Sequence, residues 1–372
     1  MAINWLSYHE LPDGLHKKFA TMFAHAPSSE LIHNVSTHLE TLQVNDHLLF
    51  TTTINDAAIE NSFVCSPYTA YALYAQDELK AKVPNKLLQY SVLWIIKLLG
   101  LLFKIGRIDR NIHVNNFLLS TNPYQEWDGK EIAKITDAIR LKYPKHAIIF
   151  RSLNLQQHQN LINSFELNGY HKVGSRQVYI YEMPYESWLK HNNNKNDLRL
   201  IKKQKLRYLS HQEMGSYLDE ALALYNLLYL QKYSKYNPQF SINYFQECHR
   251  NNLIHFQGYA DEQGKLRAFS GLFILDQTIT SPLVGYDTKA PQKDGLYIHA
   301  INLIFKYKFE SGKILNLSSG ASQFKRLRGG VPYVEYSVIY LRHLPSYRKL
   351  VWYFLIFVSN KIGIPLTQKY EL

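Results

Sequence analysis

The spacing of apolar residues in the first half of the chain predicts alternating helices and strands. Ile132, Ile135 and Ile139 follow the helical repeat, and residues 146–150 form a short apolar run typical of a buried strand. Gly169 follows Asn168 at a point where the helical pattern stops, as expected for a helix C-terminus. We therefore predict strand, helix, strand, helix and strand over residues 116–122, 130–143, 146–150, 156–167 and 178–181.

A similar succession recurs after a polar, asparagine-rich stretch at residues 191–197, which is typical of a linker. Two helices are expected over 218–232 and 244–250, and a hairpin turns at residues 262–264. The strand–helix–strand–helix–strand order then returns over 282–341. The sequence thus predicts two α/β domains, with an N-terminal domain over residues 1–190 and a C-terminal domain over residues 191–372.

In the second half, a strand through Val284 ends in a short turn that opens directly into a helix. Gln292, Lys293 and Gly295 belong to the turn, and Leu296 begins the helix. The first N–H groups of a helix lack partners within it, and the helix dipole adds positive charge there. This turn can therefore hold a phosphate or pyrophosphate, with Lys293 as an added cation. The alternative is an ordinary connection in which glycine supplies an unusual backbone conformation.

This order of elements resembles the acyl-CoA-binding core of the GNAT acyltransferase superfamily. The turn Gln292-Lys293-Asp294-Gly295 is similar to part of that superfamily's Gln/Arg-x-x-Gly-x-Gly/Ala pyrophosphate signature, with Tyr297 at the second glycine position. The recurrence of this order of helices and strands in both halves resembles the tandem domains of the Fem-type peptidoglycan-bridge aminoacyltransferases. The resemblance implies an α/β fold of two GNAT-like domains, each a mixed, mostly antiparallel sheet flanked by helices. It also implies an active cleft, which we expect in the second domain.

Three residues beside the turn are candidate catalytic groups: Tyr286, Asp287 and His299. Aminolysis of a thioester needs an amine without its proton, so a general base near the acyl carbon accelerates the reaction. Asp287 or His299 would be that base, and Tyr286 would protonate the departing thiolate. The alternatives are a turn-initiating aspartate and a partly buried helix histidine.

A second cluster of candidates follows the next strand. Ser319 lies where that strand ends, and Lys325 and Arg328 share one face of the short helix after it. Together they would bind a phosphate, the pantetheine arm or an acidic acceptor. The alternative is a capped helix with a solvated basic face.

The composition narrows the classes of function. The net charge of +12 suits an anionic partner such as nucleic acid, an anionic membrane or a phosphate-bearing co-substrate. Cys65 and Cys248 are too few for a disulfide framework, which is typical of a reduced cytosolic protein. Paired histidine ligands, Gly-x-Ser-x-Gly and Walker-type loops are all missing, which argues against metal catalysis, serine hydrolysis and nucleotide hydrolysis.

Two apolar segments, at residues 87–103 and 350–358, carry basic flanks. The first is short for a spanning helix and contains Lys97 at its centre, which is costly inside a bilayer. With Lys86, Lys104 and Arg107, this lysine falls near one face at helical spacing, over an insertion at about residues 86–107. That pattern predicts a helix lying in the interface of an anionic membrane. The alternative is a core helix.

We expect an N-acyltransferase whose co-substrate is an acyl-CoA or acyl carrier protein thioester, with no permanently bound cofactor. The acceptor is an amine, and the interfacial segments favour a lipophilic acyl chain or acceptor. No signal-peptide pattern opens the sequence, so we expect a cytoplasmic protein attached peripherally to the inner face of the membrane. One alternative is a Fem-type transferase that uses aminoacyl-tRNA and a cell-wall precursor, since residues 199–207 form a basic helix. Another is a non-catalytic, membrane-docked binding protein.

Overall fold

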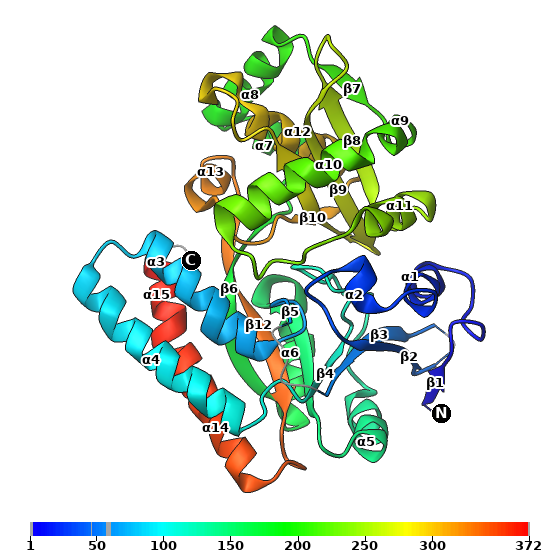
Figure 1. Ribbon diagram of the computed structural model, residues 1–372, viewed down its shortest axis with the longest axis vertical. Helices are drawn as coiled ribbons and strands as arrows, with labels where there is room; N and C mark the ends of the chain where they lie inside the picture. Colours follow the sequence, from blue (N-terminus) through cyan, green and yellow to red (C-terminus); the bar gives the residue numbers. More distant parts are fainter. Residues whose placement is uncertain (1–2, 46, 57–60, 371–372) are drawn as a thin grey trace. The chain divides into compact units, whose positions relative to one another are not determined.

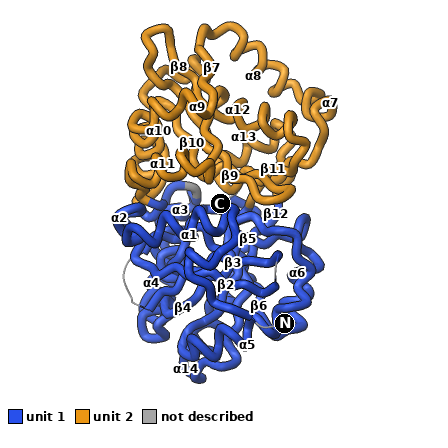
Figure 2. The backbone as a smooth tube through the Cα atoms, turned by 90° about the vertical axis from the view of Figure 1, so that its right-hand side faces the viewer, with its two compact units in different colours: residues 1–177, 236–238, 333–372 blue, residues 178–235, 239–332 orange. Residues whose placement is uncertain are grey.

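The computed structural model describes residues 3–45, 47–56 and 61–370, which form two compact units (Figure 2). Unit 1 comprises Met1–Gln177, Tyr236–Pro238 and Tyr333–Leu372, and unit 2 comprises Val178–Lys235 and Gln239–Pro332. These units differ from the predicted halves, 1–190 and 191–372, mainly at the C-terminal end. The strand β12 (Val331–Tyr340) pairs with β5 (Ala147–Asn154), so the last segment of the chain returns to the first unit.

Unit 1 is built on one sheet with helices on both faces. The strand order is β1-β2-β3-β4-β5-β12-β6, and the β4–β5 pair is parallel while β1–β2, β2–β3, β3–β4 and β5–β12 are antiparallel. The remaining strands are Asn4–Leu6 (β1), His38–Gln43 (β2), Leu49–Asn55 (β3), Asn111–Val114 (β4) and His171–Tyr181 (β6). The helices are Leu15–Ala24 (α1), Ser28–Leu31 (α2), Thr69–Tyr74 (η1), Ala75–Lys82 (α3), Lys86–Ile105 (α4), Ile132–Lys142 (α5), Leu155–Leu167 (α6), Ser346–Val358 (α14), Ser359–Gly363 (η5) and Ile364–Tyr370 (α15).

The side chains of β5 point alternately to the two faces of the strand and contribute to two different cores of unit 1. Ile148 and Phe150 belong to the core under α5 and α6, whereas Ala147 and Ile149 belong to the core under α4 and α14. Successive side chains of a strand point to opposite faces, so a continuous apolar strand supplies both cores. The predicted helices at 130–143 and 156–167 and the strand at 146–150 are confirmed as α5, α6 and β5.

The strand predicted at residues 116–122 is wrong, because this segment is a buried irregular loop. Asn115 and Leu118 adopt left-handed backbone angles (φ 57° and 56°), which break an extended strand. The side chain of Asn116 donates to Thr53 Oγ1 at 2.9 Å, and that of Asn122 accepts from Phe117 N at 2.9 Å. Asparagine side chains therefore satisfy polar groups that a neighbouring strand would otherwise satisfy.

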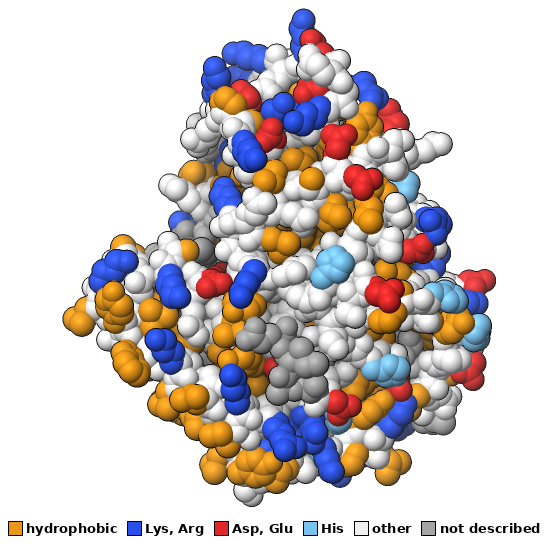
Figure 3. Space-filling model, in the orientation of Figure 1, with side chains coloured by type: hydrophobic (Ala, Val, Ile, Leu, Met, Phe, Trp, Pro, Cys, Tyr) orange, Lys and Arg blue, Asp and Glu red, His pale blue; other side chains and the backbone are white. Residues whose placement is uncertain are grey.

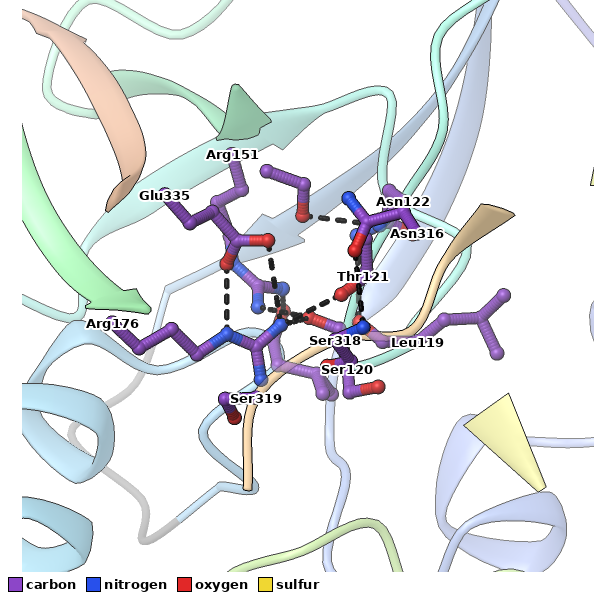
Figure 4. A network of polar contacts seen from close by, with 12 residues as sticks. Leu119, Ser120, Thr121, Asn122, Arg151, Arg176, Asn316, Ser318, Ser319 and Glu335 are labelled. Atoms are coloured by element: carbon purple, nitrogen blue, oxygen red, sulfur yellow. Dashed lines mark hydrogen bonds and ion pairs between the residues drawn. The ribbon is translucent and has the colours of Figure 1, made fainter. Parts of the chain in front are cut away.

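A polar network is buried at the inner end of this loop (Figure 4). Arg176 of β6 donates from Nε to Glu335 Oε1 of β12 at 2.9 Å and from Nη2 to Thr121 Oγ1 at 2.8 Å. The Glu335 side chain is 3% exposed, so its charge depends on this partner rather than on water. Arg151 of β5 lies in the same network and donates to Ser120 O at 3.5 Å.

We expect Glu335→Ala to lower the free energy of unfolding of the protein by about 3–5 kcal/mol, because it leaves a buried guanidinium uncompensated. Asp128→Ala is the matched control. It removes an ion pair with Lys130 whose side chains are 57% and 81% exposed, and exposed pairs contribute about 0–1 kcal/mol. Urea denaturation followed by circular dichroism measures both variants. Equal denaturation midpoints would contradict the structural weight given to the buried pair.

Unit 2 begins with the end of β6, and its strands follow in the order β6-β11-β10-β9-β8-β7. The pairing of β10 with β11 is parallel, and the other pairings are antiparallel. The strands are Arg207–Leu209 (β7), His255–Ala260 (β8), Leu266–Leu275 (β9), Thr278–Tyr286 (β10) and Ile314–Asn316 (β11). The helices are Tyr185–Trp188 (α7), Asn192–Lys203 (α8), His211–Met214 (α9), Gly215–Tyr217 (η2), Leu218–Tyr225 (α10), Asn226–Tyr233 (η3), Ile242–Arg250 (α11), Gln292–Asp294 (η4), Leu296–Ser311 (α12) and Ser322–Arg326 (α13).

Helices cover both faces of this sheet (Figure 1). Val284 of β10 lies in the core with Ala300 and Ile304 of α12. The next residue, Gly285, faces the other way, where an added Cβ would lie 2.9 Å from Leu224 Cβ of α10. The expected α/β class with mixed, mostly antiparallel strands is confirmed.

The predicted linker at residues 191–197 is wrong, because Asn192–Lys203 forms helix α8. Asn194 is fully buried and donates from Nδ2 to Trp188 O at 2.7 Å. Asp197 is also buried, against Arg328. Tertiary partners for these polar side chains convert a linker-like composition into a packed helix.

Candidate functional site

The two central strands of unit 2 part from each other. β10 and β11 pair only from Thr278 to Thr280, after which β11 ends at Asn316 while β10 continues to Tyr286. A bulge between Thr280 and Leu283 coincides with the parting, and it contains Pro282, which has no N–H to donate. The far half of β10 therefore has an open edge on the β11 side.

The direction of the backbone groups along β10 follows from one hydrogen bond. Asp287 N donates to Arg267 O at 3.1 Å, so the N–H of residue 287 points toward β9. Backbone groups alternate in direction along an antiparallel ladder. The N–H groups of Tyr286 and Val284 therefore point toward the open edge.

The turn that follows β10 places an uncapped helix beginning beside this edge. Gly295 adopts a left-handed backbone (φ 59°), and α12 begins at Leu296 with no side chain capping its first turn. An uncapped N-terminus leaves the first N–H groups of a helix available for an anion, and the helix dipole favours negative charge there. The predicted strand–turn–helix is thus present with the expected boundaries.

A pocket of about 440 Å³ lies where the open edge meets this helix. Six of the predicted site residues line it: Tyr286, Asp287, Gln292, Gly295, Leu296 and Arg328. Tyr297, Phe324 and Lys232 are among the other residues of its wall. Lys293 lies in the turn but is exposed and does not line the pocket. Five of these six residues come from the predicted strand end and turn, and Arg328 comes from the predicted second cluster.

Lys232, at the end of η3, is a pocket residue that sequence reasoning missed. Its Nζ donates to the hydroxyl of Tyr286 at 3.2 Å. Burial lowers the pKa of Lys232, but the hydrogen bond and the charge of Tyr286 outweigh burial and hold that pKa above its ordinary value. The lysine therefore stays positively charged at neutral pH. Nothing in the spacing of the two residues along the chain signals their contact.

The two cations of the predicted second cluster are engaged by the protein itself. Arg328 donates to both carboxylate oxygens of Asp197, at 2.5 and 2.8 Å, and its guanidinium lies 3.4 Å from the ring centroid of Phe324. Lys325 is buried, and its Nζ donates to the carbonyls of Leu317, Ser318 and Ser319 at 2.7, 3.2 and 2.7 Å. These contacts favour a structural role.

Neither Lys325 nor Ser319 lines the pocket, so the structure does not bring them together with the turn. Arg328 does line it, although its charge is compensated by Asp197.

The two candidate bases lie in different surroundings. Asp287 lines the pocket, and its Oδ1 accepts from Lys289 N at 3.0 Å while its Oδ2 lies 3.4 Å from Nη2 of Arg267. His299 is fully buried in α12 and is not part of the pocket wall. Its Nδ1 lies 3.0 Å from Gly295 O, its Nε2 has no hydrogen-bond partner among the described residues, and burial lowers its pKa below 6.5. Their role as bases stays a prediction.

The basic helix α8 packs directly against the turn. Gln204, just beyond α8, donates from Nε2 to Asp294 O at 2.6 Å, and the Leu200 side chain lies over Gly295. The cations of this helix are exposed: Lys195, Arg199, Lys202 and Lys203. An anion at the turn would therefore lie beside a positively charged surface. Among the described residues, no group of three or more His, Cys, Asp and Glu side chains could hold a metal ion.

No family model and no curated protein matches the sequence. Solved structures do match the fold. FemX, at 8% identity, covers 94% of this chain and 100% of its own, with a TM-score of 0.56. A conserved protein of unknown function from Bacteroides thetaiotaomicron, at 13% identity, covers 91% and 99%, with a TM-score of 0.50. A tandem GNAT protein from the clavulanic acid biosynthesis pathway, at 8% identity, covers 93% and 99%, with a TM-score of 0.40.

The chain shares the fold of FemX over 94% of its length. The resemblance to the Fem-type proteins that was drawn from the order of elements is thereby confirmed at the level of the fold. In unit 2, the parted strands, the turn and α12 stand in the order that this resemblance implies.

We expect Gly295→Ala to destabilise the protein by about 1–3 kcal/mol, because a Cβ here meets a left-handed backbone and a neighbouring side chain. The added Cβ would lie 2.8 Å from Leu200 Cδ2. In the Leu200→Ala protein, where the clash is absent, Gly295→Ala should cause a smaller loss of stability than it causes in the wild type. The loss that remains is the part caused by the left-handed backbone. Thermal unfolding of the three variants measures this difference. A fully stable Gly295→Ala protein would contradict the backbone requirement.

Proposed function

We propose that the protein is an N-acyltransferase that moves an acyl group from a thioester to an amine in the pocket of unit 2. The observation that carries the proposal is the open edge of β10 beside the uncapped beginning of α12, in one pocket of about 440 Å³. The first feature accepts an extended amide chain, and the second accepts a phosphate. Pantetheine thioesters combine these two chemical groups.

The donor would lie along β10 with its phosphate at the turn. The amides of a pantetheine arm can pair with the backbone groups of Val284 and Tyr286, as an added strand does. The pyrophosphate of CoA would meet the first N–H groups of α12, with Lys293 near it and Lys232 inside the pocket. The exposed cations of α8 suit either the remaining phosphate of CoA or the acidic surface of an acyl carrier protein.

The reaction is an aminolysis. The lone pair of the neutral amine attacks the thioester carbon, a C–N bond forms, and the carbonyl oxygen takes up negative charge. An N–H at the open edge of β10 can stabilise that oxyanion. The intermediate collapses with cleavage of the C–S bond, and the amide nitrogen loses a proton to a base. The thiolate leaves with a proton from Tyr286, whose hydroxyl is held by Lys232 at 3.2 Å.

Positioning accounts for most of the expected acceleration, because the pocket fixes donor and acceptor in one geometry. Asp287 is the candidate base that lies in the pocket wall, where it can reach the acceptor amine. His299 would act only through a rearrangement or a water, since it lies outside the pocket wall. The acyl chain or the amine is proposed to be lipophilic on the strength of the apolar surface of unit 1.

A second candidate is a transferase that takes its acyl group from aminoacyl-tRNA. The exposed cations of α8 beside the turn favour it, because phosphate contacts supply sequence-independent affinity for nucleic acid. FemX has the same fold as this chain, at a TM-score of 0.56. The two candidates share the pocket and differ in the donor.

Measuring which donor the protein binds distinguishes the two candidate functions. We expect the protein to bind CoA or an acylated carrier protein, measured by calorimetry, and to bind aminoacyl-tRNA no better than deacylated tRNA. Lys232→Met should weaken binding of the thioester donor by about 10- to 100-fold, the range for losing a charged hydrogen-bond donor. Lys190→Met is the control, since this exposed lysine of unit 2 does not line the pocket. Preference for aminoacyl-tRNA would favour the second candidate, and binding of neither donor would overturn both.

We expect Asp287→Asn to slow single-turnover acyl transfer by about 10²-fold or more without a matching loss of donor affinity. Tyr286→Phe should slow release of the thiol and spare affinity in the same way. If neither Asp287→Asn nor His299→Ala lowers the rate tenfold, a general base is not part of the mechanism.

The pH dependence distinguishes the two bases. Burial lowers the pKa of His299 below 6.5, so a neutral His299 is available throughout the range above pH 6.5 and is lost only as the pH falls below it. If His299 is the base, the acidic limb of the rate profile should lie below pH 6.5 and should disappear in His299→Ala. An acidic limb that persists in this variant would assign the titration to another group.

A further inference from the structure

Helix α4 exposes a continuous apolar stripe. Leu87, Trp94, Leu101 and Ile105 are 79%, 73%, 62% and 67% exposed, and they recur at the spacing of one helix face. The opposite face is buried in the core of unit 1 through Val92, Ile96, Leu99 and Phe103. The helix is therefore apolar on both sides, although within the described part of the chain only one side packs against the protein.

The C-terminal helical segment repeats this arrangement. Leu350 and Phe357 of α14 are 68% and 58% exposed, whereas Trp352 and Leu355 are buried in the same core as α4. The two helices lie side by side (Figure 1), and an added Cβ on Gly106, at the end of α4, would lie 2.9 Å from Val351. Their exposed faces thus form one surface, here called the α4–α14 face. Figure 3 shows hydrophobic side chains interspersed with lysine and arginine over this region.

The α4–α14 face carries charge of one sign. Neither α4 nor the segment from Ser346 to Tyr370 contains an acidic residue. Lys97 emerges inside the stripe, with its Nζ 5.7 Å from the ring centroid of Trp94. A lysine in this position can lay its apolar stem on the surface and direct its ammonium toward phosphates. Further exposed cations border the face: Lys86, Lys104, Arg107, Lys361 and Lys369.

By length and composition alone, two helical segments among the described residues could cross a membrane, Lys86–Ile105 and Ser346–Tyr370. The contacts of the second segment favour a helix that lies on the membrane instead. Arg348, buried at its start, donates to Gly106 O at 2.9 Å and to Arg110 O at 3.1 Å. Asn360, near its middle, donates from Nδ2 to Lys172 O and accepts from Gly174 N, both at 2.8 Å. A spanning helix would have to break these bonds.

We propose that the α4–α14 face docks unit 1 onto an anionic phospholipid membrane, with both helices lying in the plane of the interface. Apolar burial and charge attraction would act together, as they do for interfacial amphipathic helices. Lipid is the occupant that the charges favour, because a bare basic rim around aromatic and aliphatic side chains matches phosphate headgroups above acyl chains. This inference stands on unit 1 alone and does not depend on the reaction proposed for unit 2.

Co-sedimentation of the full chain with vesicles tests the proposal. The protein should bind phosphatidylcholine vesicles that contain phosphatidylglycerol, bind pure phosphatidylcholine vesicles less, and lose affinity as salt rises. Each lysine near an anionic surface contributes about 1 kcal/mol, which is about fivefold in the partition constant. Lys97→Glu with Lys104→Glu should therefore weaken binding by more than about 25-fold. Lys18→Glu with Lys134→Glu is the charge-matched control, at exposed positions outside the face.

The apolar term has its own variant and control. Trp94→Asp with Leu98→Asp should weaken binding by about tenfold or more and leave the circular dichroism spectrum unchanged, because both side chains point to solvent. Leu141→Asp with Leu167→Asp alters two side chains of unit 1 that are 88% and 87% exposed and lie outside the face, and binding should not change.

Lack of sedimentation of the wild type with anionic vesicles would overturn the proposal. So would light scattering that shows a dimer which the Trp94→Asp and Leu98→Asp variant converts to a monomer, since the occupant would then be a second copy of the chain. If that variant is unfolded, the lysine pair still decides the matter, because charge reversal at exposed lysines leaves the core intact.

Discussion

The parting of β10 and β11 is the constraint on which the site in unit 2 depends. Lys325 maintains it, because its buried ammonium draws together the carbonyls of Leu317, Ser318 and Ser319 directly after β11. Ser318 adopts a left-handed backbone (φ 55°), so the chain curls at this point instead of continuing beside β10. The far half of β10 therefore keeps an open edge on the β11 side.

The basic residues of the protein divide by what surrounds them. Buried cations are costly unless they are paired or hydrogen-bonded. Arg328 pairs with Asp197 and Arg176 with Glu335, whereas Lys325 and Arg348 donate to backbone carbonyls. These buried cations stabilise contacts between segments of their own unit. Exposed cations remain on α8 beside the turn and around the α4–α14 face. The structure therefore exposes basic side chains on two separate surfaces, one in each unit.

The structure of unit 1 explains why part of the apolar surface of α4 and α14 stays exposed in the folded protein. β5 supplies a core on each of its faces, and α4 and α14 close one of these cores with half of their apolar residues. The other half has no protein to cover it among the described residues, which is unusual for helices so poor in charge. A transferase whose acyl chain or acceptor resides in a bilayer would gain from such a surface, because docking raises the local concentration of that substrate.

Local pattern determined the helices and strands with strong periodicity, such as α5, α6 and β5, and the strand–turn–helix from Val284 to Leu296. Periodicity reports which face of an element is buried and which turn follows it, and both are properties of neighbouring residues. The sequence alone also indicated six of the residues that line the pocket, since strand ends and helix starts meet in any fold with this order of elements. It identified the apolar and basic character of α4 for the same reason.

Only the tertiary structure decided what polar side chains do when a distant partner is available. Hydrogen bonds of the Asn116 and Asn122 side chains stabilise a buried loop where a strand was predicted. The ion pair of Asp197 with Arg328 stabilises a helix where a linker was predicted. Long-range pairing placed β12 in unit 1 and brought Lys232 to Tyr286, contacts that no local spacing encodes. The physical reason is that a buried polar group must find a hydrogen-bond partner wherever the fold supplies one.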